Sequence, residues 1–334
     1  MPKLGYGYSL YPGSPSSQPS DISGLGLWLK ADAGVSTIQE NFVSQIVLSG
    51  AGTASSNGTY VRNQSGFTSF SSESGNSIQW NAGDNVWYLF DGNEKYQCGR
   101  DLAENSWEQT NGELPVPFAK NTLTKEALFR VNSWADQSGN NKNATPIDFS
   151  PVYVSSAINN KPAIQFSDDE LRGLSFSHTG FYPKTIFAVG TISVDNMYRT
   201  MVGGNSSGVL GNYYLQTRES MSQPGFVITN DDEMGYIAFA DALTLNIPYL
   251  LGGYSDFVSN VYAFKNGVVG SGEIAQDQLQ RTLTTGYVGC GYYNLEPSDR
   301  WNGYIAEVII YNRVLTTTER KQVEGYLNAK YAIY

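Results

Sequence analysis

The chain has 334 residues, of which 40% are hydrophobic and 16% are charged, and its formal net charge is −10. It has no cluster of Lys and Arg of the kind that nucleic acids and anionic membranes require, so we expect neither partner. No apolar run is long enough to predict a transmembrane helix. The single histidine, His178, excludes most zinc sites and His-dependent catalytic triads.

Residues 1–21 are rich in Gly, Pro, Ser and Tyr, a composition that cannot bury enough apolar surface to fold alone. They predict an N-terminal arm or linker that a partner could hold. The segment has no continuous apolar core of the kind found in a signal peptide, so we expect a protein that is made in the cytoplasm and not secreted by that route. Two distant cysteines do not imply a disulfide.

Alternation of side chains predicts strands over most of the remaining chain. Leu25, Leu27 and Leu29 alternate with other residues, which indicates a first strand after residue 22. Residues 41–121 then predict a small antiparallel meander, because short strand-like runs are separated by turns rich in Gly, Ser and Asn. The strand-like runs are residues 42–49, 58–63, 67–72, 77–81 and 86–92.

Residues 122–334 predict many further strands and one helix. Asn266-Gly267 between apolar flanks is a strong signal for a two-residue hairpin. At the C-terminal end, Thr316 and Glu319 form a capping-box pattern that predicts a helix over about 317–331. No second comparable helix is predicted, which excludes a parallel α/β fold.

Three motifs in this order resemble the concanavalin-A-like, laminin-G-like jelly-roll family. They are the strand at 24–32 (GLGLWLKAD), the turn at 134–141 (WADQSGNN) and the segment 303–313 (GYIAEVIIYNR), followed by LNAKY at 327–331. The resemblance implies an all-β antiparallel sandwich that binds carbohydrate or protein. We therefore expect a sandwich built from 22–40 plus 122–334, an inserted module at 41–121 and an arm at 1–21.

Two shorter segments resemble proteins of tailed bacteriophages. The start LGYGYSL at 4–10 is similar to virion proteins, and phrases within 41–121 are similar to small β modules of phage structural proteins. These resemblances imply a virion component, exposed on the particle and multimeric there, with the arm anchored to other virion proteins. Copy number would then multiply weak contacts to the host surface.

Aromatic side chains near turns are the candidate ligand-binding residues. A pyranose ring can pack on a rigid aromatic face at low entropic cost, which makes Tyr88, Trp107, Tyr213 and Tyr292 candidates. The alternative is that these rings fill the core or end strands. Trp87 and Tyr88 are adjacent in a predicted strand and should face opposite sides, with Trp87 in the core.

Acidic loops offer candidate calcium ligands, although no cofactor is required by the sequence. Calcium prefers six to eight oxygen ligands, and Asp136 with Asn140 in one turn could supply some of them. Asp168 and Asp231 begin two acidic triplets that could supply others. The alternative is that the turn bonds its own backbone and that the triplets are solvated loops.

No catalytic motif was found, so we expect a protein that is not an enzyme. A nucleophile elbow, a Walker motif and a strand of alternating acids are all missing from the sequence. The leading hypothesis is a phage virion surface protein whose lectin-like sandwich binds a host glycan or protein. The alternatives are a capsid decoration, cement or tail protein with protein contacts only, and, less favoured, a glycan hydrolase of the same fold.

Overall fold

A computed structural model of the chain divides into two compact units. Unit 1 comprises Met1–Ile38 and Arg130–Tyr334, and unit 2 comprises Gln39–Phe129. The structure describes residues 18–49, 51, 53–63, 69–81, 84, 86–98, 107–110, 118–119, 124–167, 172–179, 181–194, 197–205, 213–217, 223–229, 234–238, 242–255, 260–270, 273–274, 283–293 and 296–334.

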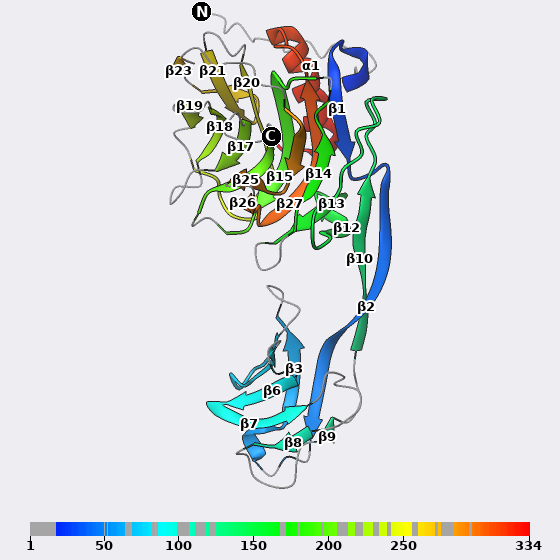
Figure 1. The fold of residues 1–334 in the computed structure, drawn as a ribbon, viewed down its shortest axis with the longest axis vertical. Helices are drawn as coiled ribbons and strands as arrows, with labels where there is room; N and C mark the ends of the chain where they lie inside the picture. The colour runs from blue at the N-terminus through cyan, green and yellow to red at the C-terminus, as the bar shows by residue number, and fades with distance from the viewer. Residues whose placement is uncertain are drawn as a thin grey trace, which may run out of the picture. The chain divides into compact units, whose positions relative to one another are not determined.

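The first sheet of unit 1 is centred on β27 (Gly303–Tyr311), which is buried along almost its whole length. Its antiparallel neighbours are β15 on one side and β13 and β1 on the other, and the sheet continues from β15 through β20 to β21 (Figure 1). The other strands are β1 (Leu25–Lys30), β12 (Val152–Ile158), β13 (Lys161–Phe166), β15 (Thr185–Ile192), β20 (Tyr249–Ser255), β21 (Asn260–Lys265), β22 (Val268–Val269) and β23 (Glu273–Ile274).

The second sheet of unit 1 has the strand order β11-β14-β24-β16-β17-β18-β19, with antiparallel neighbours throughout. These strands are β11 (Thr145–Pro146), β14 (Leu174–Ser177), β16 (Arg199–Asn205), β17 (Tyr213–Thr217), β18 (Pro224–Thr229), β19 (Met234–Ala238) and β24 (Thr285–Val288). A short hairpin of β25 (Gly291–Tyr293) and β26 (Glu296–Ser298) lies beyond β24 along the chain.

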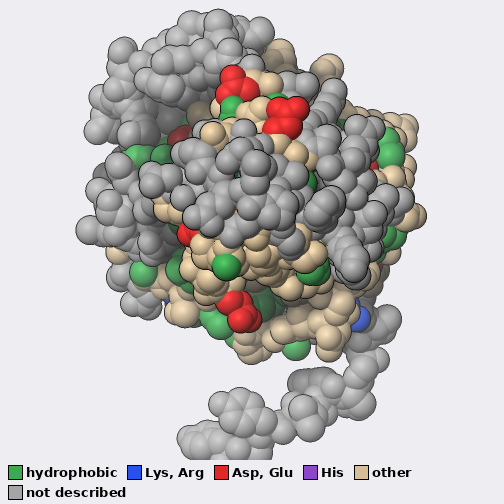
Figure 2. Space-filling model, turned by 90° about the horizontal axis from the view of Figure 1, so that it is seen from below, with side chains coloured by type: hydrophobic (Ala, Val, Ile, Leu, Met, Phe, Trp, Pro, Cys, Tyr) green, Lys and Arg blue, Asp and Glu red, His purple; other side chains and the backbone are tan. Residues whose placement is uncertain are grey.

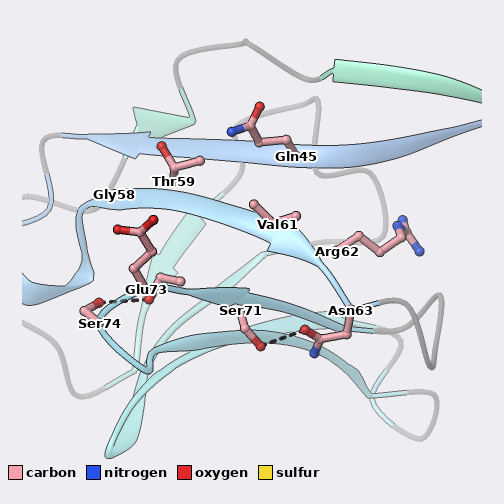
Figure 3. Close-up of a pocket in the computed structure, with 10 residues that line it drawn as sticks. Gln45, Gly58, Thr59, Val61, Arg62, Asn63, Ser71, Glu73 and Ser74 are labelled. Atoms are coloured by element: carbon pink, nitrogen blue, oxygen red, sulfur yellow. Dashed lines mark hydrogen bonds between the residues drawn. The ribbon is translucent and has the colours of Figure 1, made fainter.

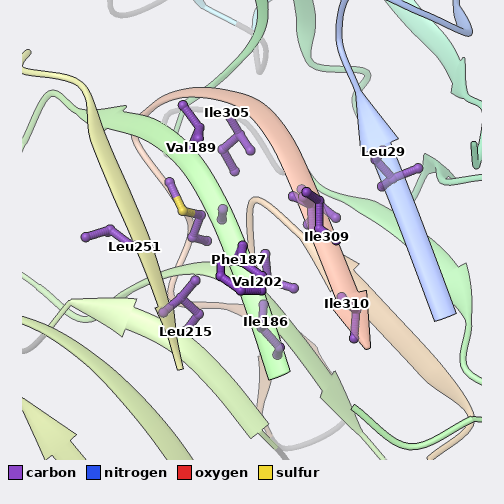
Figure 4. Packing of buried hydrophobic residues seen from close by; sticks show 14 of the residues in the cluster. Leu29, Ile186, Phe187, Val189, Val202, Leu215, Leu251, Ile305, Ile309 and Ile310 are labelled. Atoms are coloured by element: carbon purple, nitrogen blue, oxygen red, sulfur yellow. The ribbon is translucent and has the colours of Figure 1, made fainter. Parts of the chain in front are cut away.

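The two sheets of unit 1 pack face to face around one hydrophobic core. Side chains of both sheets, among them Ile309 and Phe187 from the first and Val202 and Leu215 from the second, are fully or almost fully buried in it (Figure 4). The sheets approach so closely that a Cβ at Gly253 of β20 would clash with the Phe226 ring of β18. The fold is therefore an antiparallel β-sandwich, as the sequence predicted.

Local sequence signals at the end of unit 1 are confirmed. Helix α1 (Thr317–Tyr331) begins with Thr316 as its N-cap, and Thr316 and Glu319 satisfy each other's backbone N–H groups as a capping box. The hairpin between β21 and β22 turns through Asn266 and Gly267, both of which have positive φ angles. A two-residue turn in which both residues have positive φ has a backbone twist that matches the right-handed twist of the flanking strands.

Of the predicted N-terminal arm, residues 1–17 lie outside the described residues. The following Pro19–Asp21 form a short 3-10 helix, η1, and Pro19 is buried. The Tyr311 hydroxyl donates a hydrogen bond to the Pro19 carbonyl oxygen at 2.9 Å, which ties η1 to β27. This end of the predicted arm is thus part of the sandwich.

Unit 2 is an antiparallel meander, the inserted fold that the sequence predicted. Strand β3 pairs with β2, and β3 to β8 then pair in chain order, each with the next. Strands β2 (Val35–Ser49) and β10 (Thr124–Trp134) connect it to unit 1. The remaining elements are η2 (Ala54–Ser56), β3 (Gly58–Arg62), β4 (Ser69–Ser72), β5 (Ser77–Asn81), β6 (Val86–Asp91), β7 (Asn93–Cys98), β8 (Trp107–Gln109) and β9 (Phe118–Ala119).

Alternate side chains of the meander build a separate core in unit 2. Buried members from successive strands are Ile46, Tyr60, Phe70, Ile78 and Leu89. Their neighbours along each strand therefore point to the opposite, outer face of the sheet. Across the described residues of both units, no helix is long and apolar enough to cross a membrane.

Candidate functional site

Tyr88 of β6 lies on the outer face of the unit 2 sheet. Its neighbour Trp87 is buried in the core, as the alternation of the strand predicted, whereas Tyr88 is half-buried. The Tyr88 hydroxyl donates to the Asp84 carboxylate at 3.0 Å, and the ring lies 6.0 Å from that of Phe90. Tyr88 thus remains a proposed ligand-binding residue with a side chain that reaches solvent.

The other three aromatic candidates are placed differently. Trp107 is buried in the core of unit 2, and Tyr213 is buried in the core of unit 1, so neither ring presents a face to solvent. The side chain of Tyr292, in β25, lies outside the described residues. A stacking role for Trp107 or Tyr213 would require the surrounding core to open.

The turn that contains the proposed calcium ligands Asp136 and Asn140 is held by hydrogen bonds within the protein. One oxygen of Asp136 accepts from the backbone N–H groups of Trp28 and Ser138 at 3.0 and 2.9 Å. The other accepts from the Ser138 hydroxyl and the Lys142 N–H at 2.7 and 3.1 Å. Because both oxygens have two protein donors, Asp136 has no lone pair left for a cation.

Asn140 completes this turn by anchoring it to β1. Its amide nitrogen donates to the carbonyl oxygens of Leu25 and Gly26 at 2.9 and 3.2 Å. The other two proposed calcium ligands, Asp168 and Asp231, lie outside the described residues. Within the described part of the chain, no three His, Cys, Asp or Glu side chains converge as metal ligands would.

Glu307 is a buried carboxylate of unit 1, and each of its two oxygens accepts two hydrogen bonds. It lies on β27 and has no exposed surface. One of its oxygens accepts from Trp28 Nε1 at 2.6 Å and from the Tyr326 hydroxyl at 3.0 Å. The other accepts from Lys330 Nζ at 2.8 Å and from the Tyr331 hydroxyl at 2.9 Å.

We call these five residues the Glu307 cluster; the members besides Glu307 are Trp28, Tyr326, Lys330 and Tyr331. Burial, followed by the charge of Glu307, raises the pKa of both tyrosines well above the ordinary value, so their hydroxyls remain donors. The cluster joins β1, β27 and α1, so one buried carboxylate holds the first strand, the closing strand and the helix together. Its bonding leaves no place for a substrate, so its role is structural.

His178 is buried beside the loop that follows β14. A hydrogen bond of 2.6 Å joins its Nε2 to the Tyr213 hydroxyl, and the rings of Phe176 and Phe181 lie against it. Burial, with a smaller contribution from the Lys142 charge, lowers the pKa of His178 to about 3. The imidazole is therefore neutral at physiological pH and forms part of the core.

A recess on unit 1 brings together two segments about a hundred residues apart. It has a volume of about 330 Å³ and is lined by Met197, Tyr198, Arg199, Ser298, Asp299 and Arg300. Met197 and Tyr198 are 55% and 40% exposed, although both are large and largely apolar. The recess therefore presents an apolar and aromatic surface beside charged groups.

Hydrogen bonds to backbone carbonyl oxygens fix the shape of this recess. The Thr200 N–H donates to the Asp299 carbonyl oxygen at 2.6 Å, and Arg199 Nη1 donates to the Arg300 carbonyl oxygen at 2.9 Å. Arg199 is buried, and burial raises the pKa of Asp299 above its ordinary value. Two guanidinium groups, one carboxylate and an exposed tyrosine thus lie around one small concavity, a combination that sequence reasoning missed.

The described surface seen in Figure 2 has few cationic side chains. Hydrophobic and uncharged polar groups cover most of it, with separate Asp and Glu side chains between them. This distribution agrees with the net charge of −10 and offers no extended basic patch to a polyanion on that face.

No protein-family model matches the chain, and no curated protein matches it in sequence. Among solved structures, it is similar to the CBM40 of the Ruminococcus gnavus IT-sialidase bound to alpha2,3 sialyllactose, at a TM-score of 0.38 and 14% identity, over 43% of this chain and 84% of that one. It is also similar to the receptor binding domain of botulinum neurotoxin mosaic serotype C/D, at a TM-score of 0.46 and 12% identity.

That second similarity covers 58% of this chain and 48% of the toxin domain. A third structure, the binding domain of botulinum neurotoxin serotype G, has a TM-score of 0.46 and 13% identity, with 59% of this chain and 49% of that one covered. The chain thus spans about half the length of the toxin domains that it matches.

Proposed function

We propose that unit 1 is a non-enzymatic binding unit that takes a glycan with a carboxylate group in the recess between Met197–Arg199 and Ser298–Arg300. The observation that carries this proposal is the combination of an exposed Tyr198 with the charged side chains of one small concavity. A planar guanidinium matches a carboxylate in shape and charge. An aromatic face matches the apolar side of a sugar ring.

The same recess supports binding better than cleavage. Asp299 is the one carboxylate among its six lining residues. Hydrolysis of a glycosidic bond ordinarily needs two carboxyl groups placed on opposite sides of the bond. A glycan held here would be bound without a second acid to complete such a pair.

A binding measurement with a matched surface control tests this proposal. A panel of oligosaccharides with and without carboxylate groups is titrated against the full chain and against Tyr198→Ala. We expect the carboxylate-bearing members to bind wild type, and Tyr198→Ala to weaken them at least about tenfold, or about 1.4 kcal/mol. Phe149→Ala removes a ring that is 57% exposed and lies outside the recess, so its binding should equal that of wild type.

Either of two results would contradict the proposal: carboxylate-bearing oligosaccharides that do not bind, or binding that Tyr198→Ala and Phe149→Ala weaken equally. Circular dichroism of the variants confirms that each has kept its fold.

We further propose that the protein is displayed on a bacteriophage particle, where the glycan belongs to the host surface. This part is supported by the sequence resemblances at 4–10 and within 41–121, and many copies would raise a weak affinity by avidity. Mass spectrometry of purified particles should find the protein in fixed stoichiometry. Stoichiometric protein with no glycan affinity would favour the alternative, a decoration or tail component with protein contacts only.

A further inference from the structure

The outer face of unit 2 contains a second concavity, in a part of the chain that the proposed function does not use. It is a groove of about 830 Å³ over β2, β3 and β4 (Figure 3). Gln45 pairs with Val61, and Val61 pairs with Ser71, so one row of side chains crosses all three strands. Thr59, two residues from Val61 on β3, lies on the same face as this row, and Figure 3 shows Gln45, Thr59 and Val61 directed into one space.

Several groove side chains are held in place before any ligand arrives. The Asn63 amide donates to the Ser69 hydroxyl at 2.8 Å and accepts from the Ser71 hydroxyl at 2.9 Å. The hydroxyls of Ser72 and Ser74 are 2.8 Å apart. Such fixed groups lower the entropy cost of binding, because they do not have to be ordered by the ligand.

The chemistry of the groove is that of a surface for hydroxyl groups. Its lining combines amides and hydroxyls, which both donate and accept hydrogen bonds, with Val61, whose side chain is 55% exposed. Glu73 is the one carboxylate of the lining, and the other charged lining residue, Arg62, pairs with the buried Phe70 on the face of the sheet opposite to Val61. The Arg62 guanidinium also lies over the Phe70 ring, 4.6 Å from its centroid.

Binding of an extended peptide by strand addition is excluded at this place. Strand β3 is paired on one side with β2 and on the other with β4. A peptide strand needs an unpaired sheet edge whose backbone groups are free to bond. The floor of the groove therefore offers a ligand its side chains rather than a backbone edge.

We propose that this groove binds a neutral oligosaccharide, as a second site that is separate from the recess of unit 1. Hydroxyl-rich sugars match the amides and hydroxyls of the groove, and the apolar face of a sugar ring matches Val61.

The test uses the full chain and a panel of neutral hexose and N-acetylhexosamine oligomers. Val61→Lys places a longer side chain in the groove. Because Val61 lies on the outer face of β3, the substitution does not alter the core of unit 2. Gln79→Lys introduces the same side chain at an exposed outer-face position of β5 that does not line the groove. We expect wild type and Gln79→Lys to bind neutral oligomers equally and Val61→Lys to bind at least about tenfold more weakly.

The two proposals fail in different ways. Val61→Lys should leave the binding of carboxylate-bearing oligosaccharides unchanged, and Tyr198→Ala should leave the binding of neutral oligomers unchanged. The groove proposal is overturned if wild type binds no neutral oligomer, or if Val61→Lys and Gln79→Lys bind alike. It is also overturned if the groove instead captures a protein ligand whose binding Val61→Lys abolishes while no neutral oligomer competes.

Discussion

Two clusters of unit 1 contain similar side chains and have opposite surroundings. The Glu307 cluster combines a carboxylate, a cation and two tyrosines, and its carboxylate is fully buried with four donors around it. The recess combines a carboxylate, two guanidinium groups and a tyrosine, and Tyr198 is exposed. Residue types alone therefore do not mark a binding site. Complete burial with two donors at each oxygen makes the Glu307 cluster structural, whereas the exposed Tyr198 makes the recess the proposed binding surface.

Removal of the buried Glu307 carboxylate should have the largest effect on stability. Glu307→Ala leaves the buried donors of Trp28 and Tyr326 without an acceptor and removes one of the two carboxylates that Lys330 bonds, the other being Asp32 at the same distance of 2.8 Å. We expect the free energy of unfolding to fall by about 2–6 kcal/mol, because each of these two buried donors costs about 1–3 kcal/mol when it is left unsatisfied. Urea denaturation followed by tryptophan fluorescence measures this change.

A loss below about 1 kcal/mol would mean that the cluster contributes no more than an exposed ion pair, and the structural assignment would be wrong. If Glu307→Ala does not fold, Tyr326→Phe removes one donor only. It should lower the free energy of unfolding by about 1.5–3 kcal/mol, the range for a hydrogen bond to a charged group.

His178 is also buried in unit 1, but only one of its two ring nitrogens has a hydrogen-bond partner among the described residues. Its Nε2 bonds to Tyr213, while Nδ1 is buried with no partner among the described residues. The pKa is about 3 in the folded chain against 6.5 for the ordinary group, so below pH 6.5 the unfolded chain binds a proton that the folded chain does not. Stability therefore falls as the pH falls from 6.5 towards 3.

By pH 4.5, two pH units below the ordinary pKa, the loss should reach about 2–3 kcal/mol. Urea denaturation at a series of pH values measures it. His178→Gln cannot gain this proton and should remove most of the dependence between pH 6.5 and 4.5. An unchanged dependence in the variant would assign the effect to other groups.

The smallest effect is expected at the ion pair of Arg313 and Glu319, which is well bonded but partly exposed. Arg313 donates to both oxygens of Glu319 at 2.9 and 2.6 Å, and the pKa of Glu319 is lowered to about 2 by this bond, followed by its bonds to Thr316. Because the pKa of Glu319 is lowered in the folded chain, the stability that this ion pair contributes is present above pH 4.5 and is lost as the pH falls towards 2. Glu319→Gln should shift the urea midpoint far less than Glu307→Ala. An equal shift would mean that this ion pair stabilises the fold as much as the buried Glu307 cluster does, which would contradict the expected order.

Local signals in the sequence predicted the parts of the fold that depend on neighbouring residues. The capping box at Thr316, the hairpin at Asn266-Gly267 and the opposite faces of Trp87 and Tyr88 all follow from a few consecutive residues. The Asp136 turn could be recognised as a motif, but its bonds to Trp28 could not, because that partner lies 108 residues away.

The two proposed binding surfaces could not be predicted, because each is assembled by the fold. The recess joins residues 197–199 to 298–300, and no sequence pattern relates segments so far apart. A signal for Glu307 was visible, since one carboxylate interrupts the apolar run of β27, but its four partners come from β1 and α1. Aromatic residue type alone also did not separate the buried Tyr213 from the exposed Tyr198.

A crystal structure of the complex tests most directly whether the recess of unit 1 holds a glycan. Crystals of the full chain would be soaked with the carboxylate-bearing oligosaccharide that binds most tightly in solution. We expect sugar density between Met197–Arg199 and Ser298–Arg300, with the carboxylate of the sugar towards a guanidinium and a ring face on Tyr198. Density for that carboxylate-bearing sugar elsewhere on the chain, with the recess empty, would contradict it.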